Sequence, residues 1–408
     1  MFDFRNSVQP SHKKKMEIMS NQPKGSIVGL GVTPMGRIYG RRAVDFAAEA
    51  IALALDDAGL SKADIDGLLI NANIPGDMDV RSQMILGFEN LTLVNVMSAY
   101  GSTAGSMMQY ACMAIREGLA NTVVLVYADA PLTPSRGAGQ SYAGPHRFPL
   151  GGIPGLKAAY GDFGANPAYA MAARRHMHLY GTTEDHFGII AIGQRKWAQM
   201  SPWAQMKAPM TMEDHHNSRW IAEPLRLFDC CLVSNGAVAL IVTSPERARN
   251  LKQPPVNILG YAQCAPGDNL RSDRHPAVET GAKKSGEMAF RMAGITRDDI
   301  GTCQLYDCYT YTVLVTLEDY GFCEKGEGGP FVADGKLGPG GSLPTNTGGG
   351  QLSGYYMWAF TPLSEAVVQA RGQGGARQVP RNDFVLVSGN GGILNYHSTA
   401  ILSRHISG

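Results

Sequence analysis

Two tyrosines occupy segments whose composition suits proton transfer. Tyr306 lies in the run Gln304-Leu-Tyr-Asp-Cys-Tyr309, and Tyr356 follows a glycine-rich run that begins at Asn346. A phenol is a weak acid and its anion is a stronger base than neutral imidazole, so two phenols could fill two proton-transfer roles. Because the pKa of free tyrosine is about 10, one phenol would need help from a cluster of amides or a helix end. Either tyrosine could instead be a core residue whose hydroxyl is hydrogen-bonded.

A serine stands where a strand is predicted to turn into a helix. Ser98 occupies this turn in the run Val94-Asn-Val-Met-Ser-Ala-Tyr-Gly-Ser-Thr103. The N–H groups at the start of a helix favour negative charge nearby. A hydroxyl, unlike a thiol, is not appreciably ionised near neutral pH and needs a positioned base to act as a nucleophile. The alternative is that Ser98 only begins the helix, where serine is common.

The histidines are weaker candidates. His215 and His216 follow an acidic pair, which superficially suggests a metal site. Adjacent residues on a helix diverge by about 100° and make poor co-ligands, so we expect a solvated loop there. His146 and His186 have no partner at ligand spacing and are interpreted as surface or lid residues. His397 follows a glycine-rich C-terminal loop and stays open as a site residue.

Composition excludes several classes of function. The seven cysteines contain no two neighbouring Cys-x2-Cys pairs, so no metal site is expected, and an odd number favours reduced thiols in the cytoplasm. The 36 basic and 35 acidic residues nearly cancel, which gives no attraction to nucleic acid or to an anionic membrane. No apolar run reaches the roughly 18 residues that span a bilayer. Residues 1–24 are polar, lack the apolar stretch of a secretory signal, and are interpreted as a flexible arm.

The elements that must position these residues alternate between helices and strands. Apolar residues at helical spacing predict a helix over 44–58, ending at Gly59. Strands are predicted at 66–70, 122–127, 237–242, 302–306 and 384–388, and further helices at 102–118, 310–320 and 362–371. The run Ala-Gly-Ile at 293–295 repeats the Ala-Gly-Leu at 58–60, again between a helix and a strand. This order predicts an internal duplication with halves at 25–250 and 255–408.

A long insertion interrupts the first half. It covers about 130–230, is rich in proline, glycine, tryptophan and methionine, and contains predicted helices at 168–180 and 185–200. An excursion of this length between a strand and its neighbour is usually functional. We expect it to cap a substrate cleft.

Two segments, which begin at residues 98 and 306, resemble active-site loops of thiolases, especially of the sterol-carrier-protein type. The run Ser98-Ala-Tyr-Gly101 is similar to Cys-Ala-Ser-Gly at the thiolase nucleophile, with Ser98 in place of the cysteine. The run Tyr306-Asp-Cys-Tyr309 is similar to His-Asp-Cys-Phe, with Tyr306 in place of the histidine.

Two later segments continue the resemblance in the same order. The run from Asn346 is similar to Asn-Pro-x-Gly-Gly-x-x-Ser-x-Gly-His-Pro, which places Tyr356 at the second histidine, although a slip of one residue would select Tyr355. The run Ser388-Gly-Asn-Gly-Gly392 takes the place of the C-terminal Cys-x-Gly-Gly loop. The resemblance covers nearly the whole chain from about residue 25. It implies a thiolase-like α/β fold, with duplicated βαβαβαββ halves in a layered αβαβα arrangement.

The replaced residues imply a changed reaction. This set of exchanges is similar to that of thiolase-like aldolases, called lipid-transfer proteins, that shorten steroid side chains. The resemblance implies retro-aldol cleavage of a β-hydroxyacyl-CoA thioester, with Tyr306 and Tyr356 as the catalytic pair. No acyl group is transferred to the enzyme in such a step, so no cysteine is needed.

Further residues are expected to support the pair. Backbone N–H groups near Ser98 and Gly391 are candidates to hold the enolate oxygen. Asp307 is expected to orient its loop rather than to react, and Asn346 and Tyr355 complete the set of supporting candidates.

The resemblance also implies partners. We expect a homodimer and a small partner protein with a zinc ribbon and an OB-fold, together a heterotetramer. CoA enters as part of the acyl-CoA substrate, no tightly bound cofactor is expected, and the acyl group stays open between steroid-type and aromatic side chains. Two other functions stay open: a degenerate thiolase or acyl-CoA acyltransferase that uses Ser98, and a non-catalytic lipid-binding subunit.

Overall fold

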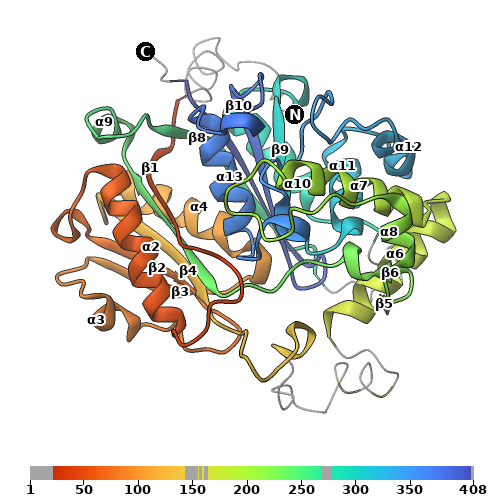
Figure 1. Cartoon of the computed structure of the whole chain (residues 1–408). Helices are drawn as coiled ribbons and strands as arrows, with labels where there is room; N and C mark the ends of the chain where they lie inside the picture. The colour runs from red at the N-terminus through yellow and green to blue at the C-terminus, as the bar shows by residue number, and fades with distance from the viewer. Residues whose placement is uncertain (1–21, 143–154, 156–158, 160–163, 268–277, 406–408) are drawn as a thin grey trace, which may run out of the picture.

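The computed structural model describes residues 22–142, 155, 159, 164–267 and 278–405 (Figure 1). Most of the expected N-terminal arm therefore lies outside the described residues, and so does His146. The strands are β1 (Gly25–Val32), β2 (Gly67–Asn71), β3 (Leu93–Met97), β4 (Thr122–Asp129), β5 (Trp220–Ala222), β6 (Leu225–Arg226), β7 (Gly236–Thr243), β8 (Val256–Cys264), β9 (Thr302–Gln304), β10 (Phe384–Gly391) and β11 (Tyr396–Ser403). The helices are α2 (Ala43–Ala58), α3 (Ser82–Leu86), α4 (Thr103–Arg116), α6 (Ala165–Tyr180), α7 (Glu184–Ala198), α8 (Met212–Asn217), α9 (Pro245–Ala248), α10 (Ala282–Ala293), α11 (Thr310–Tyr320), α12 (Gly328–Ala333) and α13 (Phe360–Ala370).

The main sheet has nine strands in the order β3-β2-β4-β7-β1-β8-β11-β10-β9. From the centre outwards, both sides repeat one pattern. On one side, β1 pairs with β7 and β7 with β4, both antiparallel, and β2 then pairs with β4 in parallel. On the other side, β8 pairs with β11 and β11 with β10, both antiparallel, and β9 then pairs with β10 in parallel. The bridge between Cys303 and Thr345 is parallel, like the pairing of β2 with β3. The duplication that the sequence predicts is therefore present in the topology.

The repeated Ala-Gly motif has the same local structure twice. Both α2 and α10 end at a glycine in the left-handed conformation, Gly59 with φ 70° and Gly294 with φ 67°. A hydroxyl residue then caps a short 3-10 turn, since the backbone N–H groups of Ser61 and Thr296 donate to the carboxylates of residues 64 and 299. Glycine suits these positions because it adopts positive φ without steric cost. Each turn then leads into the parallel strand of its half.

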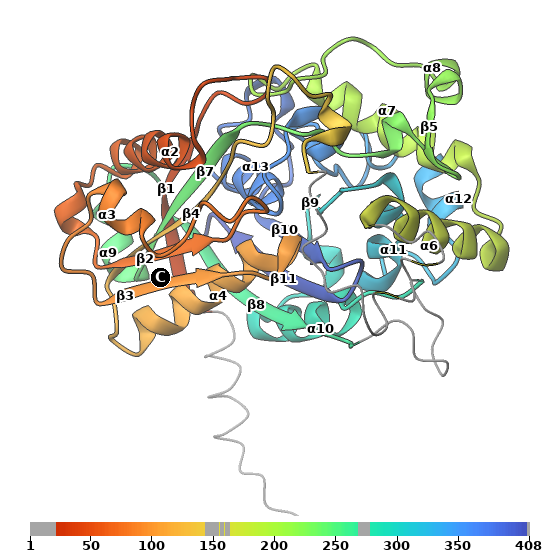
Figure 2. The same cartoon turned by 90° about the horizontal axis from the view of Figure 1, so that it is seen from below.

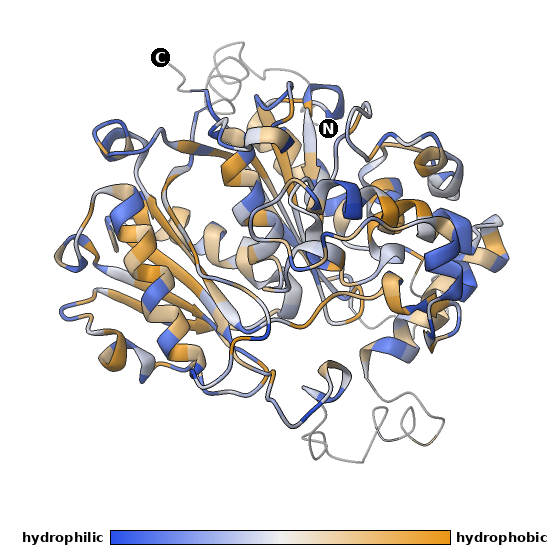
Figure 3. Cartoon of the chain, in the orientation of Figure 1, coloured by the Kyte–Doolittle hydropathy of each residue, from blue (hydrophilic) through white to orange (hydrophobic). Residues whose placement is uncertain are grey.

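Helices form layers on both faces of the twisted sheet. α2 packs on β1, β4 and β7, and α10 packs on β8 and β11. α4 and α13 lie between the two halves and contact strands of both (Figures 1 and 2). Every residue of α13 is buried, as expected of a helix enclosed on all sides. Apolar residues gather on the strands and on these central helices (Figure 3). The layered α/β fold with duplicated halves that the sequence predicts is confirmed.

The insertion between β4 and β7 packs on the C-terminal half. Its helix α7 contacts α11, α12 and a π-helical turn at Gly350–Gly354. The backbone N–H groups of Gln205 and Met206 donate to carbonyls of that turn at 3.0 Å each. The predicted limits of the halves and of the insertion stay predictions. Within the described residues, no helix is long and apolar enough to cross a membrane.

Candidate active site

Tyr306 lies just beyond the end of β9. Its backbone N–H donates to the Ser388 carbonyl of β10 at 3.1 Å, and its side chain is 5% exposed. The ring lies directly against Gly101, in the turn that joins β3 to α4. A Cβ at residue 101 would approach Cζ and Cε2 of Tyr306 to well under 3.0 Å. The absence of a side chain at Gly101 therefore sets where the Tyr306 ring can lie.

Tyr356 lies in a different segment of the chain from Tyr306. It follows the π-helical turn Gly350–Gly354, and its backbone N–H donates to Ser234 Oγ at 3.0 Å. Its side chain is half-buried, and its hydroxyl lies 3.4 Å from the hydroxyl of Tyr306. The two tyrosines, 50 residues apart in the chain, are thus brought into contact through their phenolic oxygens.

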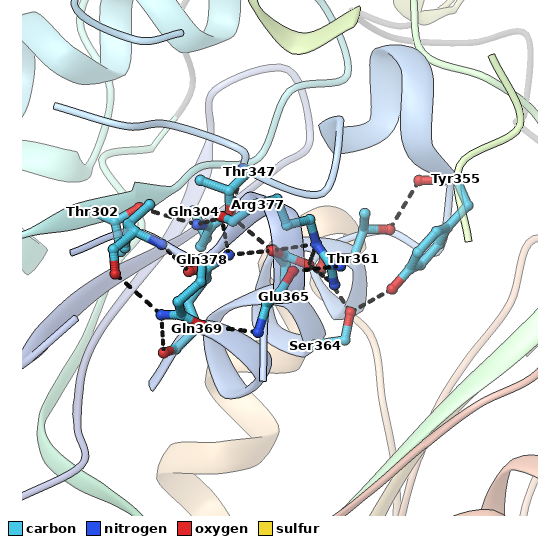
Figure 4. Close-up of polar contacts among 12 residues, drawn as sticks. Thr302, Gln304, Thr347, Tyr355, Thr361, Ser364, Glu365, Gln369, Arg377 and Gln378 are labelled. Carbon is cyan, nitrogen blue, oxygen red and sulfur yellow. Dashed lines mark hydrogen bonds and ion pairs between the residues drawn. The ribbon is translucent and has the colours of Figure 1, made fainter. Parts of the chain in front are cut away.

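Tyr355 points away from this pair. Its hydroxyl is bonded to Ser364 Oγ of α13 at 2.5 Å, and the Thr361 hydroxyl donates to its carbonyl (Figure 4). Ser364 adjoins Glu365, which Arg377 holds from two of its nitrogens in the same buried network (Figure 4). The hydroxyl of Tyr356, not that of Tyr355, therefore contacts the hydroxyl of Tyr306.

Asp307 connects the two tyrosine segments. Its fully buried carboxylate accepts the backbone N–H of Gln351 at 2.8 and 3.0 Å and that of Leu352 at 3.3 Å. Burial raises the pKa of Asp307 to about 7, against these hydrogen bonds, which lower it. Gly350 has φ +58° and packs directly on the carboxylate. Asp307 thus holds the turn that precedes Tyr356.

Asn346 also joins the two segments. It adopts a left-handed φ of 54°, and its Oδ1 accepts the backbone N–H of Leu305 at 2.7 Å. Its buried Nδ2 has no partner among the described residues. Asn346 therefore fixes the backbone of the residue that precedes Tyr306.

The turn at Ser98 lies beside the C-terminal loop. Gly391 is buried and packs against the carbonyl of Ala99, and Tyr100 adopts a left-handed φ of 50°. Ser98 itself is exposed, and no described residue is hydrogen-bonded to its hydroxyl. The residue of this turn that contacts Tyr306 is Gly101.

Burial governs the ionisation of both phenols. It raises the pKa of Tyr306 well above the usual value, and Tyr356 and Cys308 raise it further. It also raises the pKa of Tyr356, which Cys231, Cys308 and Asp129 raise further, while the hydrogen bond from Tyr306 lowers it. Both phenols therefore hold their protons at neutral pH.

The histidines lie elsewhere, and one prediction about them is wrong. His215 is not in a solvated loop: it is buried in α8, and its Nε2 lies 2.9 Å from Asp229 Oδ1. The prediction considered only whether two adjacent histidines could share a metal ion, so it missed Asp229 as a hydrogen-bond partner of His215.

His397 is buried behind the site, where its Nε2 lies 3.0 Å from Ser388 Oγ and 3.0 Å from the Tyr320 hydroxyl. Half-buried His186 lies in α7 against Gly329. Among the described residues, no cluster of His, Cys, Asp or Glu could hold a metal.

Sequence reasoning missed a buried carboxylate that is bound by two phenols. Asp129 ends β4, is 1% exposed, and accepts hydrogen bonds from the hydroxyls of Tyr127 and Tyr142. The available signal was an acidic residue directly after the apolar run 122–128. Such a residue at the carboxyl end of a buried strand is a reasonable site candidate.

Comparisons with known proteins agree with this fold. Residues 265–404 match the family model described as thiolase C-terminal domain-like. The chain is 38% identical to the 17-hydroxy-3-oxo-4-pregnene-20-carboxyl-CoA lyase of Mycobacterium tuberculosis, over 91% of this chain and 97% of that protein. It is 39% identical to the steroid side-chain-cleaving aldolase of Thermomonospora curvata, over 85% and 90% of the two chains.

Solved structures give the same picture. The Ltp2-ChsH2(DUF35) aldolase superimposes with a TM-score of 0.82 at 35% identity, covering 94% of this chain and 98% of that one. A monomeric SCP2-thiolase-like protein of Mycobacterium smegmatis superimposes with a TM-score of 0.73, covering 95% of this chain and 79% of that one. At 20% identity, the second match supports the fold alone.

Proposed function

We propose that this chain, which belongs to the steroid side-chain-cleaving aldolases of the thiolase superfamily, cleaves a β-hydroxyacyl-CoA thioester by a retro-aldol reaction. The products are a shorter acyl-CoA and a ketone or aldehyde. The acyl group is of steroid type, as the names of the relatives suggest, or an aromatic side chain. CoA takes part only as a portion of the substrate.

The contact between the phenolic oxygens of Tyr306 and Tyr356 carries this proposal. In a retro-aldol step the β-hydroxyl loses its proton, and the bond between the α and β carbons breaks. The electron pair of that bond forms the thioester enolate, which is then protonated at the α carbon. Two phenols in contact can pass a proton from oxygen to carbon without either becoming a free anion. This suits a buried pair, because a tyrosinate would be strongly disfavoured there.

The enolate oxygen needs hydrogen-bond donors. The backbone around Ser98 and Gly391 is our candidate, since the turn that includes Ser98 and the Gly391 strand end lie against each other beside Tyr306. Preorganised backbone N–H groups stabilise such an anion by roughly 3 kcal/mol each. Asp307 and Asn346 act indirectly by fixing the segments that carry the two tyrosines.

Substitution of each tyrosine by phenylalanine tests the proposal, with Tyr355→Phe as a matched control. Tyr306→Phe and Tyr356→Phe should each reduce kcat by about 10²- to 10⁴-fold, since each removes one proton-transfer group. Tyr355→Phe removes a buried hydroxyl next in sequence, whose partner is Ser364, and should leave kcat within a few-fold of the parent. The assay follows the carbonyl product and the acyl-CoA by mass spectrometry. Near-normal turnover in both Tyr306→Phe and Tyr356→Phe would contradict the proposal.

The same assay separates the other functions. A degenerate thiolase or acyltransferase would consume free CoA, whereas an aldolase does not. An acyltransferase that uses Ser98 would need a base, and the described residues place none on its hydroxyl. A lipid-binding subunit would give no product from any β-hydroxyacyl-CoA, even with a partner protein present.

A homodimer and a small partner protein complete the proposal. β3 is an edge strand of the sheet, and Val80, Met84 and Ile85 nearby are 56%, 73% and 59% exposed. Apolar exposure beside an open strand edge is typical of a protein interface. For the small partner, the support is the complex named for the structural relative, and we propose a protein with a zinc ribbon and an OB-fold. Turnover measured with and without such a partner tests this assembly, and we propose the cytoplasm as its location.

A further inference from the structure

The backbone on both sides of Tyr356 is held by hydroxyl groups. The Thr361 hydroxyl donates to the Tyr355 carbonyl at 3.1 Å, and its oxygen accepts the backbone N–H of Met357 at 2.9 Å. Ser234 Oγ accepts the backbone N–H of Tyr356 at 3.0 Å. Two side chains therefore bind three of the four polar atoms in the two peptide groups that flank Tyr356.

Both hydroxyls are themselves fixed in place. Thr361 lies in the first turn of α13, a helix whose every residue is buried, and that helix is held by the buried ion pair of Glu365 with Arg377 (Figure 4). Ser234 is also buried, and Gln205 Nε2 donates to its Oγ at 2.6 Å. A hydroxyl on a rigid, buried element has little freedom to move, so it fixes the groups to which it is bonded.

The position of the Tyr356 hydroxyl depends on this backbone. The hydroxyl contacts that of Tyr306 at 3.4 Å, near the upper limit of a hydrogen bond, and so long a bond does not by itself hold the ring. Rotation of either flanking peptide group turns the Cα–Cβ bond of Tyr356, and the hydroxyl, at the far end of the ring, moves furthest. A displacement of about 1 Å between reacting groups can reduce the rate by about 10²-fold.

We propose that Thr361 and Ser234 are positioning residues of the aldolase reaction, whose hydroxyls fix the Tyr356 backbone so that its phenol stays in contact with that of Tyr306. The inference rests on the proposed function. Both hydroxyls act through the peptide groups beside Tyr356 and exchange no proton with the substrate. The Tyr355 hydroxyl is bonded elsewhere on α13, so Tyr355→Phe leaves these bonds in place.

The test begins with Thr361→Val, which keeps the shape of the side chain but removes the hydroxyl. kcat should fall by about tenfold to 10²-fold at nearly unchanged KM, because the substrate is still bound but the phenol is displaced. Thr361→Ser restores a hydroxyl and should recover most of the rate. Thr316→Val is the matched control, since Thr316 is buried in α11 and its hydroxyl has no partner among the described residues. The control should turn over like the parent.

Tyr356→Phe distinguishes positioning from a general structural role. Where the phenol is already absent its position no longer matters, so Thr361→Val should change the remaining rate of Tyr356→Phe by less than about twofold. A purely structural role would lower the rate by the same factor in both backgrounds. Equal factors, or a Thr361→Val enzyme as fast as Thr316→Val, would overturn the inference.

Ser234→Ala keeps the test decisive if Thr361→Val does not fold. It removes the acceptor of the Tyr356 N–H, so its effect on kcat should likewise disappear in the Tyr356→Phe background. An undiminished rate, or an equal loss in both backgrounds, would count against the inference. The two proposals fail separately. Active Tyr306→Phe and Tyr356→Phe enzymes would refute the proposed function, whereas inactive ones with undiminished turnover of Thr361→Val and Ser234→Ala would refute only the positioning role.

Discussion

Gly101→Ala should separate the two phenols without substituting either tyrosine. A Cβ at this position would lie well under 3.0 Å from the Tyr306 ring, whereas ordinary contact begins at 3.4 Å. It would also meet the carbonyl of Asn390, so the backbone leaves no other direction for relief. The ring must therefore retreat by about 1 Å, a displacement that can cost about 10²-fold in rate when it affects reacting groups.

This movement would break the contact between the two hydroxyls. The oxygens of Tyr306 and Tyr356 are already 3.4 Å apart, near the upper limit of a hydrogen bond. We expect kcat to fall by about 10²-fold, and overpacking to lower the free energy of unfolding by about 1–3 kcal/mol. Steady-state turnover and thermal unfolding of the same preparations give both values.

Gly139→Ala is the matched control. Gly139 lies in an exposed turn, and a Cβ there would meet nothing within 4 Å. This variant should keep the kcat and the melting temperature of the parent. If Gly101→Ala, once shown to be folded, turned over as fast as Gly139→Ala, the position of the Tyr306 ring could not control the reaction.

Three further predictions concern stability and assembly. The pKa of Asp307 rises from 3.8 to about 7 on folding, so the free energy of unfolding should fall as pH rises from about 4 to 7, and chemical denaturation of Asp307→Asn should lack this part of the decline. Burial lowers the pKa of His397 from 6.5 to about 3, so stability should fall as pH drops below 6.5, and His397→Gln should show a shallower loss in the same measurement. Met84→Asp combined with Ile85→Asp places two charges on the exposed patch beside β3 and should give monomers by light scattering, whereas an unchanged dimer would place the interface elsewhere.

Elements with a strong local signal were predictable from the sequence. The helix predicted at 44–58 is α2, Ala43–Ala58, because its apolar spacing and its terminal glycine specify both the face and the end. β10 runs to Gly391, beyond the predicted end at residue 388. Pairing with β11 extends the strand through a glycine-containing run that has a low strand propensity of its own. β9 ends at Gln304, before the predicted end at residue 306, since Tyr306 turns away to enter the site.

Those features of the site that depend on contacts between distant segments could not be predicted from the sequence. The motifs indicated Tyr306 and Tyr356, and their contact depends on segments 50 residues apart. The contact between Asp129 and Tyr142 was not predicted. Asp129 ends a strand and Tyr142 lies in a loop, and no characteristic sequence spacing indicates that two such residues form a hydrogen bond. The burial of His215 likewise depends on Asp229, which reaches it only through the folded insertion.

The turn before Tyr356 is anchored by three separate parts of the chain. Arg195 of the insertion donates to Ser353 Oγ at 2.9 Å, Asp307 of the C-terminal half accepts from Gln351, and Ser234 receives the N–H of Tyr356 itself. No one of these parts can complete the site alone. Catalytic activity should consequently be the last property to return during refolding, after the secondary structure has recovered. A severed or truncated chain that retains most of its helices and strands should have no turnover, which makes catalysis a sensitive reporter of complete tertiary assembly.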